Sequence, residues 1–170
     1  MNPLQVYRGL VSTSPRLQAI LGMLPYRPVP AWLGDFEFKL YGTAYGRDHG
    51  KAPDEIEVEA QKLAALVPGQ QWTTTFIQRY HPGSGVKPHR DPRNNLGFTV
   101  IGLYGDFTPT WFTVRQPDGS DLTLEQAPGD VLVLPCTIEG VQGPLHSMGW
   151  STTVNPLKGP RYAIILNTIT

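Results

Sequence analysis

Histidine is scarce in this chain of 170 residues, and one of its four histidines stands two positions before an aspartate, in His89-Arg90-Asp91. In a strand, or at its end, residues i and i+2 point to the same face, so an imidazole and a carboxylate can converge on one ion. His146 offers a third ligand from further along the chain. Two histidines and one carboxylate leave positions open on Fe(II) for O2 and an oxidisable co-substrate. The spacing therefore predicts a catalytic metal site of His89, Asp91 and His146.

Taken one at a time, these residues have simpler explanations. A His-x-Asp pair often arises by chance, and a lone His146 is more often a surface histidine or one with satisfied hydrogen bonds. Arg161 opens a final apolar stretch, where it can pair bidentately with a dicarboxylate, or else it only caps that stretch after Lys158-Gly159-Pro160. An arginine buried there without an anionic partner would be costly. The order and spacing of His89, Asp91, His146 and Arg161 along the chain favour one site that binds a metal and an anion together.

From residue 72 onward, short apolar or β-branched stretches alternate with turns rich in Gly and Pro. Pro117-Asp118-Gly119 predicts a hairpin, and Pro128-Gly129-Asp130 marks another turn. Short strands with frequent turn signals are typical of a sandwich or jelly roll, so we expect a mainly β fold with N-terminal helices. The predicted strands span residues 72–80, 96–104, 110–115, 131–134 and 161–169.

The N-terminal third is where helices are predicted. Apolar residues repeat at helical spacing in 14–23, after Ser14-Pro15, and in 54–67, where acidic residues crowd the first turn. Between them, the aromatic stretch 35–47 begins with the alternation of a strand. The length of the chain suits a single domain, 1–170, with a hydrophobic core of its own.

The composition narrows the protein class. Fourteen Lys and Arg residues balance fourteen Asp and Glu residues, which disfavours a dedicated nucleic-acid binder without excluding a local basic patch. No apolar run is long enough for a transmembrane helix, and residues 1–10 do not read as a signal peptide. Cys136 is the single cysteine, so no disulfide can form within the chain. We expect a cytoplasmic protein without a membrane partner.

Together these motifs resemble the 2-oxoglutarate/Fe(II) dioxygenase superfamily, and within it the AlkB-like branch, from about Tyr41 to the end of the chain. The matching residues, in the family's order, are Gln78, Tyr80, Pro82-Gly83, His89, Asp91, Gly129-Asp130, His146 and Arg161. The family ends on Arg-x5-Arg, and here Asn167 replaces the second arginine. Asn167 cannot supply the cation that this arginine would.

The resemblance implies a double-stranded β-helix (jelly roll) that uses Fe(II), 2-oxoglutarate and O2 and releases succinate and CO2. It implies that Arg161 binds the distal carboxylate of the co-substrate and that Tyr80 hydrogen-bonds to the co-substrate, with Gln78 and Asn167 beside them. It also implies that residues 1–70 hold the N-terminal helices and a substrate lid, and that residues 71–170 form the jelly-roll core.

The substrate is predicted to enter beneath residues 38–49, where Tyr41 or Tyr45 would contact it and glycines would let the segment move. A nucleic acid is one candidate, because both tyrosines could stack on a base; alternatively they pack on the sheet edge. Arg93 is expected to face the substrate, where it would repel a cationic methylated base.

Two other function classes compete with a nucleic-acid oxygenase. A hydroxylase of a protein side chain or a small metabolite fits the near-zero net charge. A non-catalytic cupin-like binding module is the third class, and the complete set of His89, Asp91, His146 and Arg161 argues against it.

Overall fold

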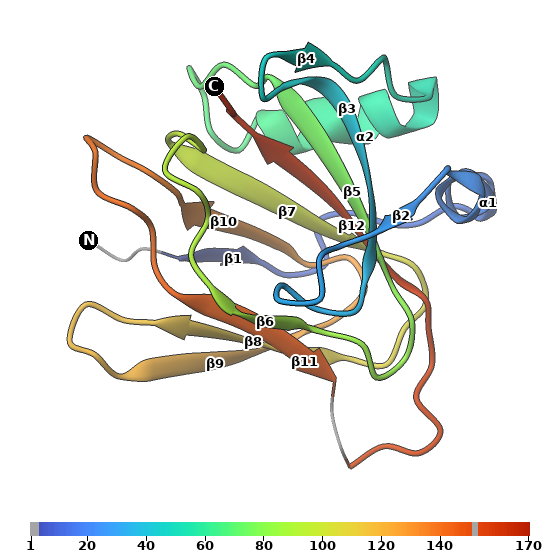
Figure 1. Ribbon diagram of the computed structural model, residues 1–170. Helices are drawn as coiled ribbons and strands as arrows, with labels where there is room; N and C mark the ends of the chain where they lie inside the picture. Colours follow the sequence, from blue (N-terminus) through green and yellow to red (C-terminus); the bar gives the residue numbers. More distant parts are fainter. Residues whose placement is uncertain (1–3, 151–152) are drawn as a thin grey trace.

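Two antiparallel sheets face each other in the computed structural model, which describes residues 4–150 and 153–170 (Figure 1). In the major sheet the strands lie in the order β1 (Gln5–Tyr7), β10 (Val131–Pro135), β7 (Phe98–Tyr104), β12 (Arg161–Asn167), β5 (Thr74–Tyr80), β3 (Glu37–Ala44) and β2 (Arg27–Pro28), and β4 (Arg47–Asp48) pairs with β3. In the minor sheet the order is β6 (Val86–His89), β11 (His146–Trp150), β8 (Thr110–Arg115) and β9 (Asp121–Gln126). This arrangement confirms the predicted jelly roll.

Strand β12 lies at the centre of the major sheet, between β5 and β7, and its alternation divides the interior in two. Ile164 and Leu166 pack on the side of the helices, whereas Ala163 and Ile165 pack between the two sheets. Side chains along a strand point alternately to its two faces, so Arg161 and Asn167 share the second face with Ala163 and Ile165. The strand therefore directs polar residues into the space between the sheets.

The two helices cover the face of the major sheet that points away from the minor sheet (Figure 1). Helix α1 (Pro15–Met23) begins as predicted, with the Ser14 hydroxyl accepting a hydrogen bond from the Leu17 N–H at 3.0 Å. Helix α2 (Asp54–Ala64) ends three residues before the predicted boundary, because the backbone tightens after Ala64 ahead of Pro68-Gly69. No helix in the described parts of the chain is long and apolar enough to cross a membrane.

The predicted lid is for the most part an ordinary strand. Strand β3 pairs with β5 from Glu37 to Gly42, so this stretch is fixed in the major sheet by a regular ladder. Gly42 has a φ of 80°, and a Cβ there would lie 2.3 Å from the Thr73 carbonyl oxygen. Glycine is therefore required at this tight bend. Residues 4–70 thus contribute strands to the core sheet as well as two helices.

Asp130 ties the N-terminal segment to the sheet. Its carboxylate is buried and accepts hydrogen bonds from Arg8 Nη1 at 2.6 Å, from the Gly9 N–H at 3.1 Å and from the Ala127 N–H at 2.9 Å. Three donors at one carboxylate explain why an acid occupies this turn before β10.

We expect Asp130→Ala to lower the free energy of unfolding by about 2–3 kcal/mol, because it removes a buried carboxylate that accepts three hydrogen bonds. Urea denaturation followed by circular dichroism measures this loss. The matched control is Asp106→Ala, which removes an ion pair with Lys158 at the surface and should change stability by less than about 1 kcal/mol. Equal unfolding midpoints for the two variants would contradict the assigned role of Asp130.

Candidate active site

His89, Asp91 and His146 converge at the edge of the minor sheet. His89 ends β6 and His146 begins β11, and the two are direct partners in the antiparallel ladder. Their Nε2 atoms each lie 3.7 Å from Asp91 Oδ1, and the ligand atoms of all three residues lie within 4.8 Å of one another. Such a cluster of two imidazoles and one carboxylate fits a divalent first-row metal ion.

The far side of each imidazole is fixed by a backbone carbonyl. Nδ1 of His89 lies 2.8 Å from the Lys87 oxygen, and Nδ1 of His146 lies 2.9 Å from the Pro144 oxygen. A carbonyl only accepts, so each Nδ1 must carry the proton and donate. The Nε2 lone pairs are then directed into the site, which is the tautomer that metal binding requires.

Asp91 is held by two further residues. Cys136 Sγ donates to Asp91 Oδ2 at 3.2 Å, and Gln142 Nε2 donates to the Asp91 backbone oxygen at 2.5 Å. These contacts leave Oδ1 directed at the two histidines. Neighbours of this kind orient the carboxylate before any ion binds.

The protonation states of the cluster suit metal binding. Burial disfavours the charged form of Asp91, but the neighbouring His89, together with His146 and the Cys136 thiol, outweighs burial and lowers the pKa of this carboxyl. Burial lowers the pKa of His146 and keeps its imidazole neutral. At His89 burial acts in the same direction, but Asp91 and the Lys87 carbonyl outweigh it and raise the pKa. The site therefore offers an ionised carboxylate and a neutral imidazole near neutral pH.

One cavity of about 380 Å³ joins the cluster to Arg161. Through the sheet register, Trp150 at the far end of β11 pairs with Thr110, and Thr110 pairs with Gln126. His146 and Gln126 thus lie four residues apart along the minor sheet, roughly 13 Å by strand rise. A molecule that contacts both the metal cluster and this far end must be elongated.

Arg161 lies at that far end, only 3 % exposed. Its Nη2 donates to Gln126 Oε1 at 3.0 Å, and its guanidinium carbon lies 4.8 Å from the centre of the Tyr80 ring. Burial lowers the pKa of Arg161 to about 10, so it remains charged at neutral pH. Among the described residues Arg161 has no carboxylate partner, and its Nε has no acceptor. A buried cation of this kind fits the carboxylate of a bound small molecule.

The other predicted co-substrate residues also line the cavity. The Tyr80 hydroxyl donates to Gln78 Oε1, and both residues belong to β5 beside Arg161. Asn167 is at the opposite end of β12 from Arg161, roughly 20 Å away along the strand. Its Oδ1 accepts hydrogen bonds from Asn95 and Thr99. The structure thus separates Asn167 from the end of the cavity at Arg161.

Of the three predicted substrate residues, one is brought to the cavity. Tyr45, at the tip of the β3–β4 hairpin, lines it and is 56 % exposed. Tyr41 points to the other face of β3 and packs in the core beneath the helices. Side chains alternate along a strand, so Tyr41 faces away from Phe38 and Leu40, which line the cavity. Arg93 is exposed, donates to the Gly140 carbonyl and does not line the cavity. Arg93 is therefore not placed to repel a cationic base bound in the cavity, contrary to the prediction.

Several residues of the site were missed by the sequence reasoning. Cys136 and Gln142 hold Asp91, and Phe112 packs against the His146 ring at 5.7 Å between ring centres. These carry no recognisable motif. Gln126 could have been found, because it continues the inward alternation of Leu122 and Leu124, and a polar residue on an inward face is a signal of a site.

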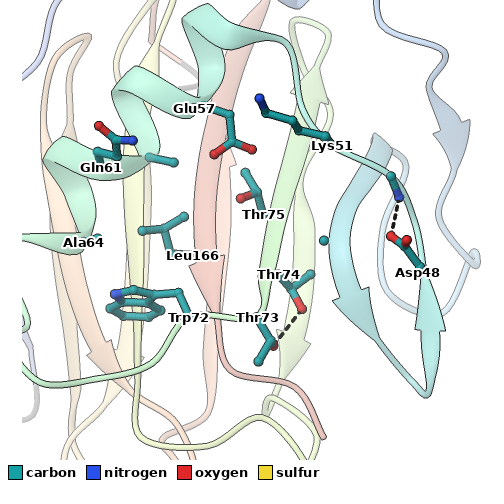
Figure 2. A pocket seen from close by; sticks show the side chains of 13 residues that line it. Asp48, Lys51, Glu57, Gln61, Ala64, Trp72, Thr73, Thr74, Thr75 and Leu166 are labelled. Atoms are coloured by element: carbon teal, nitrogen blue, oxygen red, sulfur yellow. Dashed lines mark hydrogen bonds between the residues drawn. The ribbon is translucent and has the colours of Figure 1, made fainter.

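A second cavity of about 460 Å³ lies between α2 and the β3–β4 hairpin (Figure 2). Trp72 and Leu166 lie beneath the helix there, Glu57 extends from the helix, and Lys51 lies in the segment between β4 and the helix. Its described lining has no histidine or cysteine and shares no residue with the cavity at the metal cluster. The candidate metal site belongs to the first cavity.

Comparison with known proteins supports the fold. No family model matches the chain, and no curated protein sequence matches it significantly. Solved structures do match. A 2OG-Fe(II) oxygenase family oxidoreductase from Burkholderia pseudomallei is 17 % identical with a TM-score of 0.70, over 97 % of this chain and 84 % of that one.

Two further structures share the architecture. OsALKBH1 is 12 % identical with a TM-score of 0.64, over 98 % of this chain and 96 % of that one. A Pseudomonas putida prolyl-4-hydroxylase is 10 % identical with a TM-score of 0.60, over 99 % and 93 %. The chain has the jelly-roll fold of the 2OG-Fe(II) oxygenases.

We expect His89→Ala and Asp91→Ala each to weaken Mn(II) binding at least about 100-fold, because each removes one of three ligands. Isothermal titration calorimetry with Mn(II) measures the affinity. His81→Ala is the control, since His81 is exposed and contacts Glu37 outside the cluster. Unchanged Mn(II) affinity in both ligand variants would remove the cluster from consideration as a metal site.

Proposed function

We propose that this chain is an Fe(II)- and 2-oxoglutarate-dependent dioxygenase that hydroxylates or oxidatively demethylates a substrate. The proposal rests on one cavity that is lined both by the cluster of His89, Asp91 and His146 and by Arg161. Arg161 is buried and has no carboxylate partner among the described residues. A molecule that chelates the metal at one end and carries a carboxylate at the other end would contact both the metal cluster and Arg161. 2-Oxoglutarate has this shape, and the oxygenase fold of the chain agrees with it.

Within this proposal the residues have separate tasks. Bound Fe(II) and 2-oxoglutarate would supply the oxidising power from O2, with release of succinate and CO2. His89, Asp91 and His146 would hold the metal on one side and leave its other positions open. Arg161 would neutralise the distal carboxylate. Phe112, Met148 and Ile165 line the cavity and would exclude water from it.

The entrance of the cavity is aromatic and apolar. Trp32 is 70 % exposed, Tyr45 is 56 % exposed, and both line the cavity together with Leu33, Phe38 and Val86. Asp91 is the one acid among the described lining residues, and it is committed to the metal cluster. We infer a substrate that presents a planar or apolar group at this entrance.

Two substrate classes fit this entrance. Exposed Trp32 and Tyr45 could stack on a nucleobase, and Arg90, which lines the cavity, could meet a phosphate; this favours a nucleic acid and placement in the AlkB-like branch. The largely apolar lining equally favours a protein side chain or a small metabolite. The fold is shared with both OsALKBH1 and a prolyl-4-hydroxylase, so it does not separate the two classes.

The deciding experiment is succinate release from 2-oxoglutarate in the presence of Fe(II) and O2, with panels of methylated oligonucleotides, peptides and metabolites. We expect release that one panel stimulates and that His89→Ala abolishes. Stimulation by oligonucleotides, lost in Trp32→Ala, would assign a nucleic-acid substrate. Metal and 2-oxoglutarate binding without any turnover would favour the cupin-like binding module.

We expect Arg161→Ala to raise the KM for 2-oxoglutarate at least about 100-fold, because a desolvated charge-assisted contact contributes roughly 3 kcal/mol. Steady-state kinetics at saturating Fe(II) measure it. Arg115→Ala, an exposed arginine in β8 paired with Asp121, is the matched control and should leave KM unchanged. A normal KM in Arg161→Ala would show that another cation binds the co-substrate.

A further inference from the structure

We propose that Gln126 is a second anchor for the co-substrate, whose side-chain amide donates to the same distal carboxylate that Arg161 binds. The inference rests on the proposed function and extends it to a residue outside the predicted site. It assigns to the cavity a two-donor carboxylate site built from both sheets.

Gln126 is the last residue of β9 and points inward. It is 1 % exposed and lines the cavity that also contains Arg161 and the metal cluster. Because β9 belongs to the minor sheet and β12 to the major sheet, the two side chains reach the same place from opposite walls.

The hydrogen bonds of Gln126 fix how its amide is turned. Oε1 accepts from Arg161 Nη2 at 3.0 Å and from the Thr110 hydroxyl at 3.1 Å. A guanidinium can only donate, so the atom facing it must be the amide oxygen, not the nitrogen. The –NH2 group is thereby turned away from Arg161 and Thr110, and this nitrogen has no acceptor among the described residues.

Arg161 Nε is a second buried donor without an acceptor at the same end of the cavity. Buried donors are nearly always satisfied, so two unpaired donors close together favour acceptor atoms supplied by a ligand. A carboxylate supplies two acceptor oxygens and also the negative charge that Arg161 lacks. A neutral carbonyl or hydroxyl would satisfy one donor and leave the cation uncompensated.

A purely structural role for Gln126 makes a different prediction. If Gln126 only connects the two sheets through Arg161 and Thr110, then its Oε1 atom makes all the necessary hydrogen bonds and loss of the –NH2 group should have no effect. Gln126→Glu keeps an acceptor oxygen for Arg161 and Thr110 but replaces the donor by a negatively charged oxygen that also pairs with Arg161, so Gln126→Leu is needed to test the loss of the donor without a new charge. Gln126→Leu removes both polar atoms at similar size.

The test measures binding to the Mn(II)-loaded protein by isothermal titration calorimetry, without turnover. The probes are 2-oxoglutarate and 2-oxopentanoate, which has the same chain length but no distal carboxylate. We expect wild type to prefer 2-oxoglutarate. Gln126→Glu should weaken 2-oxoglutarate binding at least about 100-fold, and Gln126→Leu about 10-fold, with Mn(II) affinity unchanged in both. Binding of 2-oxopentanoate should change little.

Thermal denaturation without ligand adds a readout that misfolding would not mimic. Gln126→Glu should have an equal or higher Tm, because Arg161 gains the carboxylate partner that it lacks in the wild type. The control Gln116→Glu makes the same charge change at an exposed turn of the β8–β9 hairpin and should bind 2-oxoglutarate normally.

Near-wild-type 2-oxoglutarate affinity in Gln126→Glu, or in Gln126→Leu should the first variant not fold, would overturn the proposal. Failure of the wild-type, Mn(II)-loaded protein to bind 2-oxoglutarate at all would instead overturn the proposed function, whatever the variants do.

Discussion

The cross-strand pairing of His89 with His146 is the constraint on which the site depends. It joins the end of β6 to the start of β11, and the Asp91 carboxylate lies 3.7 Å from both imidazoles. Residues on paired strands are positioned more accurately than residues on loops, so the sheet preorganises two of the three candidate ligands. The third is held by donors from Cys136 and Gln142, on other segments of the chain.

The interior of this sandwich is not uniformly apolar, and its polar residues are concentrated where a ligand would need them. Leu103, Leu132 and Leu134 are fully buried between the sheets. At one end of the cavity Arg161 and Gln126 face each other across the two walls. A buried guanidinium without an acid destabilises the ligand-free fold, and binding of an anion would relieve this cost.

Much of the architecture could be predicted because local sequence patterns determine many of its strands, turns and helix ends. Alternation and turn residues identified the strands 110–115 and 131–134, the hairpin between β8 and β9, and the start of both helices. The pairing of the aromatic stretch after Asp35 with β5 was not predicted, because it joins residues far apart in sequence. Sheet pairing of this kind is set by tertiary packing and not by propensity.

For the site itself, the sequence alone determined which side chains are candidate ligands. The His-x-Asp spacing places an imidazole and a carboxylate on one face of a strand, and an arginine at the start of a strand is also visible in the local sequence. It also carried the resemblance to an oxygenase family. Tertiary structure decided which side chains meet. It turned Tyr41 to the helices, left Arg93 at the surface and set Gln126 against Arg161 across two sheets. Which side chains meet depends on strand register and on the distance between the facing sheets. Neither is determined by neighbouring residues in the chain.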